Sequence, residues 1–110
     1  MPFKTELVGS TVELLVLKLL SQRAMYGYEI IQIVNERTDG AFNWKEGTLY
    51  PVLHRLENQG FLSTEWRVGD TGKKRRYYAL TRKGLAQAAD KVTEWQTFSK
   101  SVNAVLAQPA

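Results

Sequence analysis

Residues 43–60 read NWKEGTLYPVLHRLENQG and decide the fold of this 110-residue chain. Apolar side chains recur in them at the i, i+3, i+4, i+7 spacing of an amphipathic helix, at Leu49, Val52, Leu53 and Leu56. Asn43 and Glu46 have the spacing of a capping box, which predicts the start of the helix. Gly60 is placed to end it in a left-handed conformation. Pro51 lacks a backbone donor, so we expect a slight kink or a loosened first turn there.

The segments on either side complete a mainly helical chain. Two earlier helices are predicted at 5–22 and 26–38, and the first is apolar on nearly every side, so we expect a second subunit among its neighbours. Residues 62–68 have the alternation of a strand with one buried side, formed by Leu62, Thr64, Trp66 and Val68. Turn-forming residues at 69–74 lead to a return strand at 75–80. The predicted fold class is α+β, mainly α with a small antiparallel β-hairpin.

One long helix is predicted after the hairpin, over residues 81–106, with Thr81 as its N-cap. Its apolar seam has a 3-4-3-4 spacing with one polar member and consists of Leu85, Ala88, Val92, Trp95, Ser99, Val102 and Leu106. About 25 helical residues span roughly 38 Å, which is longer than the core of residues 1–80 needs. We therefore predict a dimerisation helix, with the subunit interface formed by helix 5–22 and by Leu85, Ala88, Val92, Trp95, Val102 and Leu106. Residues 107–110 are predicted to fray.

Composition excludes several classes of protein. The absence of cysteine excludes disulfides, thiolate metal sites and a cysteine nucleophile. The chain has one histidine, no paired acids in a cleft pattern and no phosphate-binding glycine loop, so we expect no enzyme, cofactor or metal site. No apolar run approaches the roughly 20 residues that span a bilayer, and residues 1–6 lack the layout of a signal peptide. These features predict a cytoplasmic chain.

Positive charge is concentrated in one part of the sequence. Residues 67–83 hold seven lysines and arginines against one aspartate, a net charge of +6, whereas the whole chain carries +4. Such a concentration indicates a polyanionic partner. The charge alone is equally compatible with a solvated hairpin whose lysines protect a sheet edge.

Three motifs between residues 26 and 84 resemble a known family. They are YGYEI at 26–30, EGTLYP followed by LxRLExxG at 46–60, and RYYxLTxxG at 76–84. Their order is similar to that of the PadR family of bacterial regulators, in its compact branch with a single C-terminal helix. The resemblance implies a winged helix-turn-helix and a dimeric repressor whose first and last helices form the subunit interface. A proline at position 51 is a trait of that family.

A winged helix-turn-helix predicts how the chain binds double-stranded DNA. The helix around Pro51 enters the major groove, and its outward residues are Lys45, Thr48, Tyr50, Pro51, His54 and Arg55. The wing supplies phosphate or minor-groove contacts from Lys73, Lys74, Arg75 and Arg76. The alternative for Tyr50 is packing against the preceding helix, and for His54 an ordinary surface position. Of Tyr77 and Tyr78, one is expected in the core. A dimer predicts a two-fold operator with half-sites roughly 34 Å apart.

A small-molecule site is predicted around Trp95, with Val92, Phe98 and Ser99. The resemblance implies that a tryptophan at this position lines a space between subunits and stacks on planar aromatic effectors. Ser99 stands where those members have an acidic residue, which leaves a preference for cations open. The alternative is that Trp95 is an interface packing residue. The sequence thus predicts a homodimeric, sequence-specific regulator of transcription, a repressor released by a small molecule. The alternative function is a winged-helix module that binds protein without DNA specificity.

Overall fold

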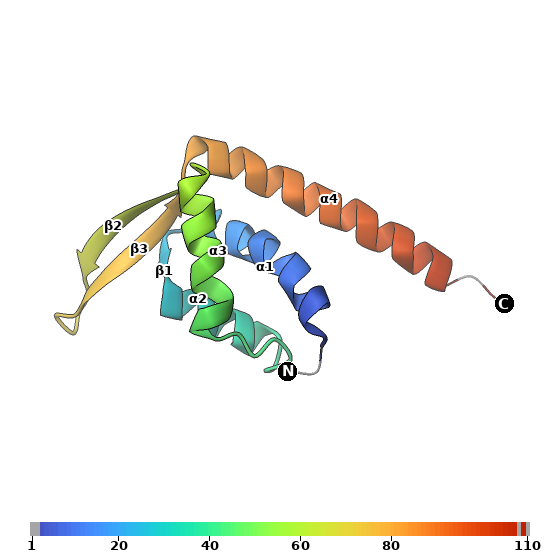
Figure 1. Ribbon diagram of the computed structural model, residues 1–110, viewed down its shortest axis with the longest axis horizontal. Helices are drawn as coiled ribbons and strands as arrows, with labels where there is room; N and C mark the ends of the chain where they lie inside the picture. The colour runs from blue at the N-terminus through green and yellow to red at the C-terminus, as the bar shows by residue number, and fades with distance from the viewer. Residues whose placement is uncertain (1–2, 108, 110) are drawn as a thin grey trace.

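The computed structural model describes residues 3–107 and 109 and shows the predicted α+β architecture (Figure 1). Its elements follow the order α1 (Thr5–Leu20), β1 (Met25–Tyr26), α2 (Gly27–Arg37), α3 (Glu46–Asn58), β2 (Leu62–Val68), β3 (Lys74–Leu80) and α4 (Arg82–Leu106). Helices α1, α2 and α3 form the head of the molecule, and α4 extends from it. Of the tail predicted to fray, residues 108 and 110 lie outside the described residues.

The sheet has three antiparallel strands in the order β1-β3-β2, one strand more than the predicted hairpin. Strands β2 and β3 pair from Leu62 opposite Leu80 to Val68 opposite Lys74. The additional strand, Met25–Tyr26, pairs with β3 and removes Tyr26 from the helix predicted at 26–38. Two residues are too few to show an alternating pattern, so the sequence held no signal for this strand.

Helix α3 begins at Glu46 and is capped by the backbone of Lys45, so the predicted capping box on Asn43 is wrong. The cause is the neighbouring Trp44, whose side chain is 1% exposed. Its backbone N–H donates to Asn35 Oδ1 over 2.8 Å, and its carbonyl accepts from Asn35 Nδ2 over 3.2 Å. These bonds hold the loop in a non-helical course until the residue after Trp44. Helix α3 then continues through Pro51.

The predicted end of α3 at Gly60 is confirmed. Gly60 has a φ of 83°, in the left-handed region that favours glycine. The N–H of Phe61 donates to the carbonyl of Leu56 over 3.0 Å, and that of Gly60 donates to Glu57 over 3.0 Å. This pair of bonds is a Schellman motif. It turns the chain sharply from α3 into β2, and so determines where the wing starts relative to α3.

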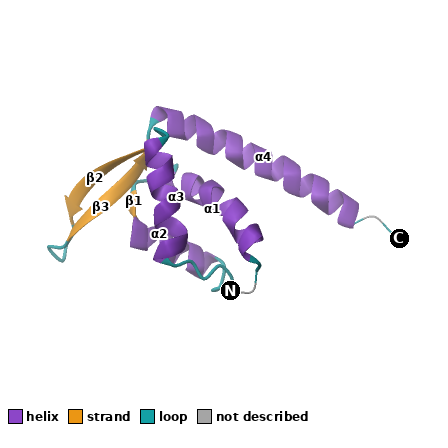
Figure 2. Cartoon of the chain, in the orientation of Figure 1, coloured by secondary structure: helices purple, strands orange, loops and turns teal. Residues whose placement is uncertain are grey.

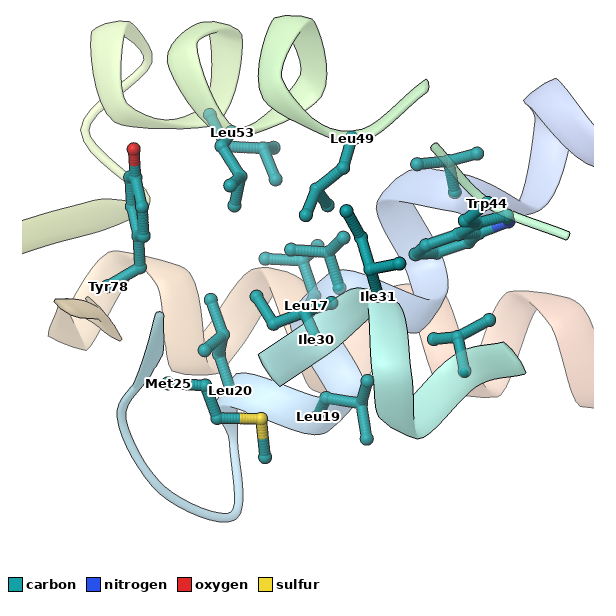
Figure 3. Close-up of a cluster of buried hydrophobic side chains, with 14 of the residues drawn as sticks. Leu17, Leu19, Leu20, Met25, Ile30, Ile31, Trp44, Leu49, Leu53 and Tyr78 are labelled. Atoms are coloured by element: carbon teal, nitrogen blue, oxygen red, sulfur yellow. The ribbon is translucent and has the colours of Figure 1, made fainter. Parts of the chain in front are cut away.

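The hydrophobic core lies where α1, α2 and α3 meet. Leu49 and Leu53 of α3 point toward Leu17 of α1 and toward Ile30 and Ile31 of α2 (Figure 3). Because these side chains occupy the inner side of α3, the opposite side of the helix faces solvent. The strands β2 and β3 project from the helices, at the end of the molecule away from the C-terminus of α4 (Figure 2). No helix within residues 3–107 is both long and apolar enough to cross a bilayer.

Candidate nucleic-acid interface

The outer side of α3 presents most of the residues predicted to bind DNA. Lys45, Pro51, His54 and Arg55 are exposed, whereas Thr48 is half-buried. Arg55 lies 3.9 Å from Glu13 of α1, a long and largely solvated ion pair that contributes little to stability. These side chains are therefore free to meet a ligand in the groove of a duplex.

Tyr50 packs against α2, as the alternative interpretation proposed. A Cβ added at Gly27 would lie 2.6 Å from Tyr50 Cζ, so only a glycine lets the ring approach the first turn of α2 this closely. Burial raises the pKa of the Tyr50 phenol, and the negative charge of Glu46 raises it further. The phenol is thus neutral and can donate a hydrogen bond. Its contact with DNA stays a prediction.

The register of the wing separates its side chains onto two sides. Tyr78 is 2% exposed and belongs to the core, so Arg76 and Lys74, two and four residues away, share its side of β3. Arg75 and Tyr77 lie on the other side, where the Arg75 guanidinium is 4.3 Å from the centre of the Tyr26 ring. This answers the question that the sequence left open about the two tyrosines.

The basic side chains of the wing differ in their interaction partners. Lys73 and Lys74 are exposed and have no ion-pair partner among the described residues. Arg76 instead donates to Glu57 Oε2 over 2.9 Å and to Thr64 Oγ1 over 3.1 Å. Because Glu57 belongs to α3, this cluster ties the wing to that helix. Glu57 belongs to the LxRLExxG motif but had no predicted role, and the predicted phosphate contact of Arg76 would have to compete with it.

Trp66 and Val68 are 61% and 68% exposed, so the prediction that they are buried is wrong, although they share a side of the strand with the buried Leu62. Only the Leu62 end of β2 reaches the core, and the strand then runs beyond the helices. Trp66 borders a hollow of about 390 Å³ between α3 and the wing, together with Tyr28, Tyr50, His54, Lys74 and Arg76. The alternation of the sequence could not predict that Trp66 lies beside α3, because alternation assigns a residue to one side of the strand but does not say which element faces that side.

Most of the apolar seam of α4 is exposed, with Ala88 as a buried member. Ala88 is 4% exposed within a single chain, so little of its side chain is left to contact a partner subunit. It fills the core beside α1, since α4 still packs on the head at that point. Large apolar side chains farther along α4 are 41% to 75% exposed, at Trp95, Phe98, Val102, Val105 and Leu106, as is Leu85 at 52%. Compared with the predicted seam, the exposed one therefore lacks Ala88 near its start and continues toward its end at Leu106.

Trp95 lies between α4 and α1 and borders two hollows. One, of about 390 Å³, is lined by Ser10, Glu13, Leu14, Lys91, Glu94 and Phe98 besides Trp95. The other, of about 260 Å³, includes Leu15, Phe42 and Val92. Ser99 lines neither, and its hydroxyl donates to the carbonyl of Gln96 over 3.3 Å. Two carboxylates that the sequence analysis did not consider, those of Glu13 and Glu94, thus stand near the tryptophan.

No group of three histidine, aspartate or glutamate side chains within the described part of the chain is arranged to hold a metal ion. Basic side chains gather on the outer side of α3 and on the wing. The arrangement is one of basic and aromatic side chains around a projecting helix, which suits contact with a nucleic acid.

Comparison with known proteins defines the class to which this architecture belongs. The model of the transcriptional regulator PadR-like family matches residues 16–90. A protein of Lysinibacillus sphaericus is 34% identical over 84% of each chain. The negative transcriptional regulator PadR of Bacillus subtilis is 25% identical over 79% of this chain and 48% of its own length. The crystal structure of a PadR-like transcriptional regulator from Bacillus cereus has a TM-score of 0.85 at 28% identity, covering 96% of this chain and all of the other.

The molecule is a winged-helix regulator of transcription that binds DNA. It belongs to the PadR-like family, whose members are transcriptional regulators and not enzymes. Tyr50, Pro51 and the wing all fall within the matched residues.

Proposed function

We propose that this chain is a repressor that binds a two-fold operator as a homodimer and is released by a planar aromatic molecule. The observation that carries the proposal is that α3 and the wing border one hollow, with Tyr50 and His54 on one side and Lys74 and Arg76 on the other. Helix and wing thus approach the same stretch of duplex together. An operator of this kind places the protein in the cytoplasm of a bacterium.

In the proposed complex, α3 lies in the major groove and determines specificity. Lys45 and Thr48 stand at its start and can hydrogen-bond to base edges, while Pro51 offers apolar contact to a thymine methyl group. Lys73 and Lys74 contact phosphates, which orient the protein but do not distinguish sequences. His54 and Arg55 lie farther along the exposed side of α3 and reach the flanking backbone or bases.

The exposed apolar residues of α4 and α1 support a homodimer. Leu7, Trp95, Phe98, Val102 and Leu106 are all more than 40% exposed in one chain, and a contiguous apolar surface of this kind marks a protein interface. A symmetric pair would present the same surface from each subunit. The two α3 helices would then meet successive major grooves about one helical turn apart, roughly 34 Å.

The surroundings of Trp95 support an aromatic effector. The indole is 43% exposed and borders both hollows, the one with Phe98, which has mixed polar and apolar walls, and the mainly apolar one with Val92. Such surfaces bind flat aromatic molecules by stacking. Glu13 and Glu94 line the first of these hollows, where Arg55 lies 3.9 Å from Glu13 and Lys91 lies 4.0 Å from Glu94, so the carboxylates do not by themselves select a cation. Repression is supported by the name of the related Bacillus subtilis protein, a negative transcriptional regulator.

Selection of bound duplexes from a random pool tests the operator. We expect an enriched consensus of two inverted half-sites whose centres lie about one helical turn apart. The same duplex should bind with an affinity that falls steeply as salt increases. Absence of any enriched sequence, together with salt-independent binding, would instead favour the protein-interaction module.

Tryptophan fluorescence tests the effector. A planar aromatic molecule should quench the emission of the wild-type protein and release it from the selected operator. Trp44 and Trp66 also emit, so the variant Trp95→Ala is the required control. Equal quenching in wild type and variant would contradict the proposed site.

A further inference from the structure

We propose that the hollow between α3 and the wing receives the sugar–phosphate backbone of one DNA strand, and that Trp66 is its apolar contact. This inference rests on the proposed binding of an operator and adds a residue that neither charge nor family motifs indicate. Trp66 is 61% exposed although tryptophan is among the most apolar and costly residues to leave in water.

The position of Trp66 in the sheet directs its ring toward α3. It pairs with Arg76, so it lies on the same side of the sheet as the buried Tyr78 and two residues nearer the tip. Tyr50 and His54 of α3 face it across the hollow. A strand of DNA that follows the groove beside α3 must pass between these two sides.

The chemistry of the hollow matches a sugar–phosphate chain, which alternates an anion with an apolar ring. The Lys74 ammonium lies 5.6 Å from the centre of the Trp66 ring and has no carboxylate partner among the described residues. The Tyr50 phenol is neutral and can donate a hydrogen bond. A phosphate can therefore sit at Lys74 and Tyr50 while the adjacent deoxyribose covers the exposed indole. The carboxylate of Glu57, at the base of the wing, is already engaged by Arg76.

Affinity for the selected operator duplex tests the contact, with Trp66→Ala and Trp66→Phe compared against Val68→Ala. Val68 is an equally exposed apolar residue on the same side of β2 but does not border the hollow. We expect Trp66→Ala to bind the duplex roughly tenfold more weakly, because the variant loses the free energy gained by burying the apolar surface of the indole. The affinity of Trp66→Phe should lie between those of Trp66→Ala and the wild type. The affinity of Val68→Ala should stay within about twofold of the wild type. Because Trp66 is exposed, circular dichroism and thermal unfolding of the variants should match the wild type.

Salt dependence separates an apolar contact from a disturbance of Lys74. The slope of log affinity against log salt should be unchanged in Trp66→Ala, because no phosphate loses its cation. A slope smaller by about 0.9, the value for one phosphate, would show that the indole only positions Lys74 and would overturn the proposal. An equal loss of affinity in Val68→Ala would overturn it as well.

Fluorescence gives an independent readout. Addition of the duplex should change the emission of the wild type and of Trp95→Phe, and the change should disappear in Trp66→Phe. If a complex forms and the emission of Trp66 does not change, the indole does not contact the DNA. That result would contradict the inference and favour a protein partner for Trp66. Failure of the wild type to bind any duplex would instead refute the proposed function, so the two outcomes are distinguishable.

Discussion

The free lysines and the engaged arginine of the wing lead to opposite expectations on mutation. Lys73 and Lys74 have no ion-pair partner among the described residues, so each can release one condensed counterion from the duplex. Changing both to alanine should lower the slope of log affinity against log salt by about 1.8. Between 50 and 200 mM salt, a slope difference of this size makes the salt-induced loss of affinity roughly tenfold smaller.

Arg76→Ala should leave that slope unchanged. Its guanidinium is held by Glu57 and Thr64 at 2.9 and 3.1 Å, so it neutralises a carboxylate of the protein and not a phosphate. The side chains of Arg76 and Glu57 are 38% and 29% exposed, and a pair so solvated contributes less than about 1 kcal/mol to the free energy of unfolding. The wing loses its connection to α3, so affinity should fall by a similar factor at every salt concentration.

Fluorescence anisotropy of a labelled operator, titrated at several salt concentrations, measures both quantities. Glu57→Gln is the matched control, because it breaks the same pair while it keeps the cation at position 76. We expect it to resemble Arg76→Ala in affinity and in slope. The reasoning is refuted if Arg76→Ala lowers the slope by about 0.9 while Glu57→Gln tightens binding, since Arg76 would then contact phosphate.

Three further predictions concern stability and assembly. Gly84→Ala should lower the free energy of unfolding by about 1–3 kcal/mol, because its Cβ would overlap the Phe61 carbonyl oxygen. The control Gly47→Ala has open space around the added Cβ and should not lower it. Equal thermal midpoints for the two variants would contradict the prediction. Val102→Asp should shift sedimentation from dimer toward monomer with the fold retained, and an unchanged dimer would place the interface elsewhere. Burial raises the pKa of Tyr78 above 10.0, so its contribution to stability is complete below pH 10 and is lost as pH rises further, because the unfolded chain ionises first. Urea unfolding from neutral to about pH 11 should show a smaller decline in Tyr78→Phe.

Much of the fold follows from local patterns. The heptad-like spacing around Leu53 predicted α3 and its buried side, and Gly60 predicted where that helix ends. The boundary at Asn43 was misplaced because a long-range bond from Asn35 to the backbone of Trp44 decides it. The two-residue strand β1 was missed because only pairing with β3 makes it a strand.

The candidate site was predictable in its composition but not in its geometry. Lys73 and Lys74 could be identified from the charge of the sequence alone, because the exposure of a lysine in a predicted loop does not depend on a partner elsewhere in the chain. Arg76 and Trp66 could not be assigned in the same way. The role of Arg76 depends on Glu57, 19 residues earlier, and the exposure of Trp66 depends on where the helices cease to cover the sheet.

The sequence by itself determined the family, the order of the four helices and the hairpin, and the concentration of positive charge in the wing. These properties depend on residue types at short spacings, which a single chain displays directly. Only the tertiary structure decided that Ala88 is core and that Trp95 is open, although both occupy one seam of α4. A helical pattern specifies which residues share a side, whereas burial depends on which other element that side meets. Ala88 packs into the core beside α1, whereas Trp95 on the same seam stays 43% exposed.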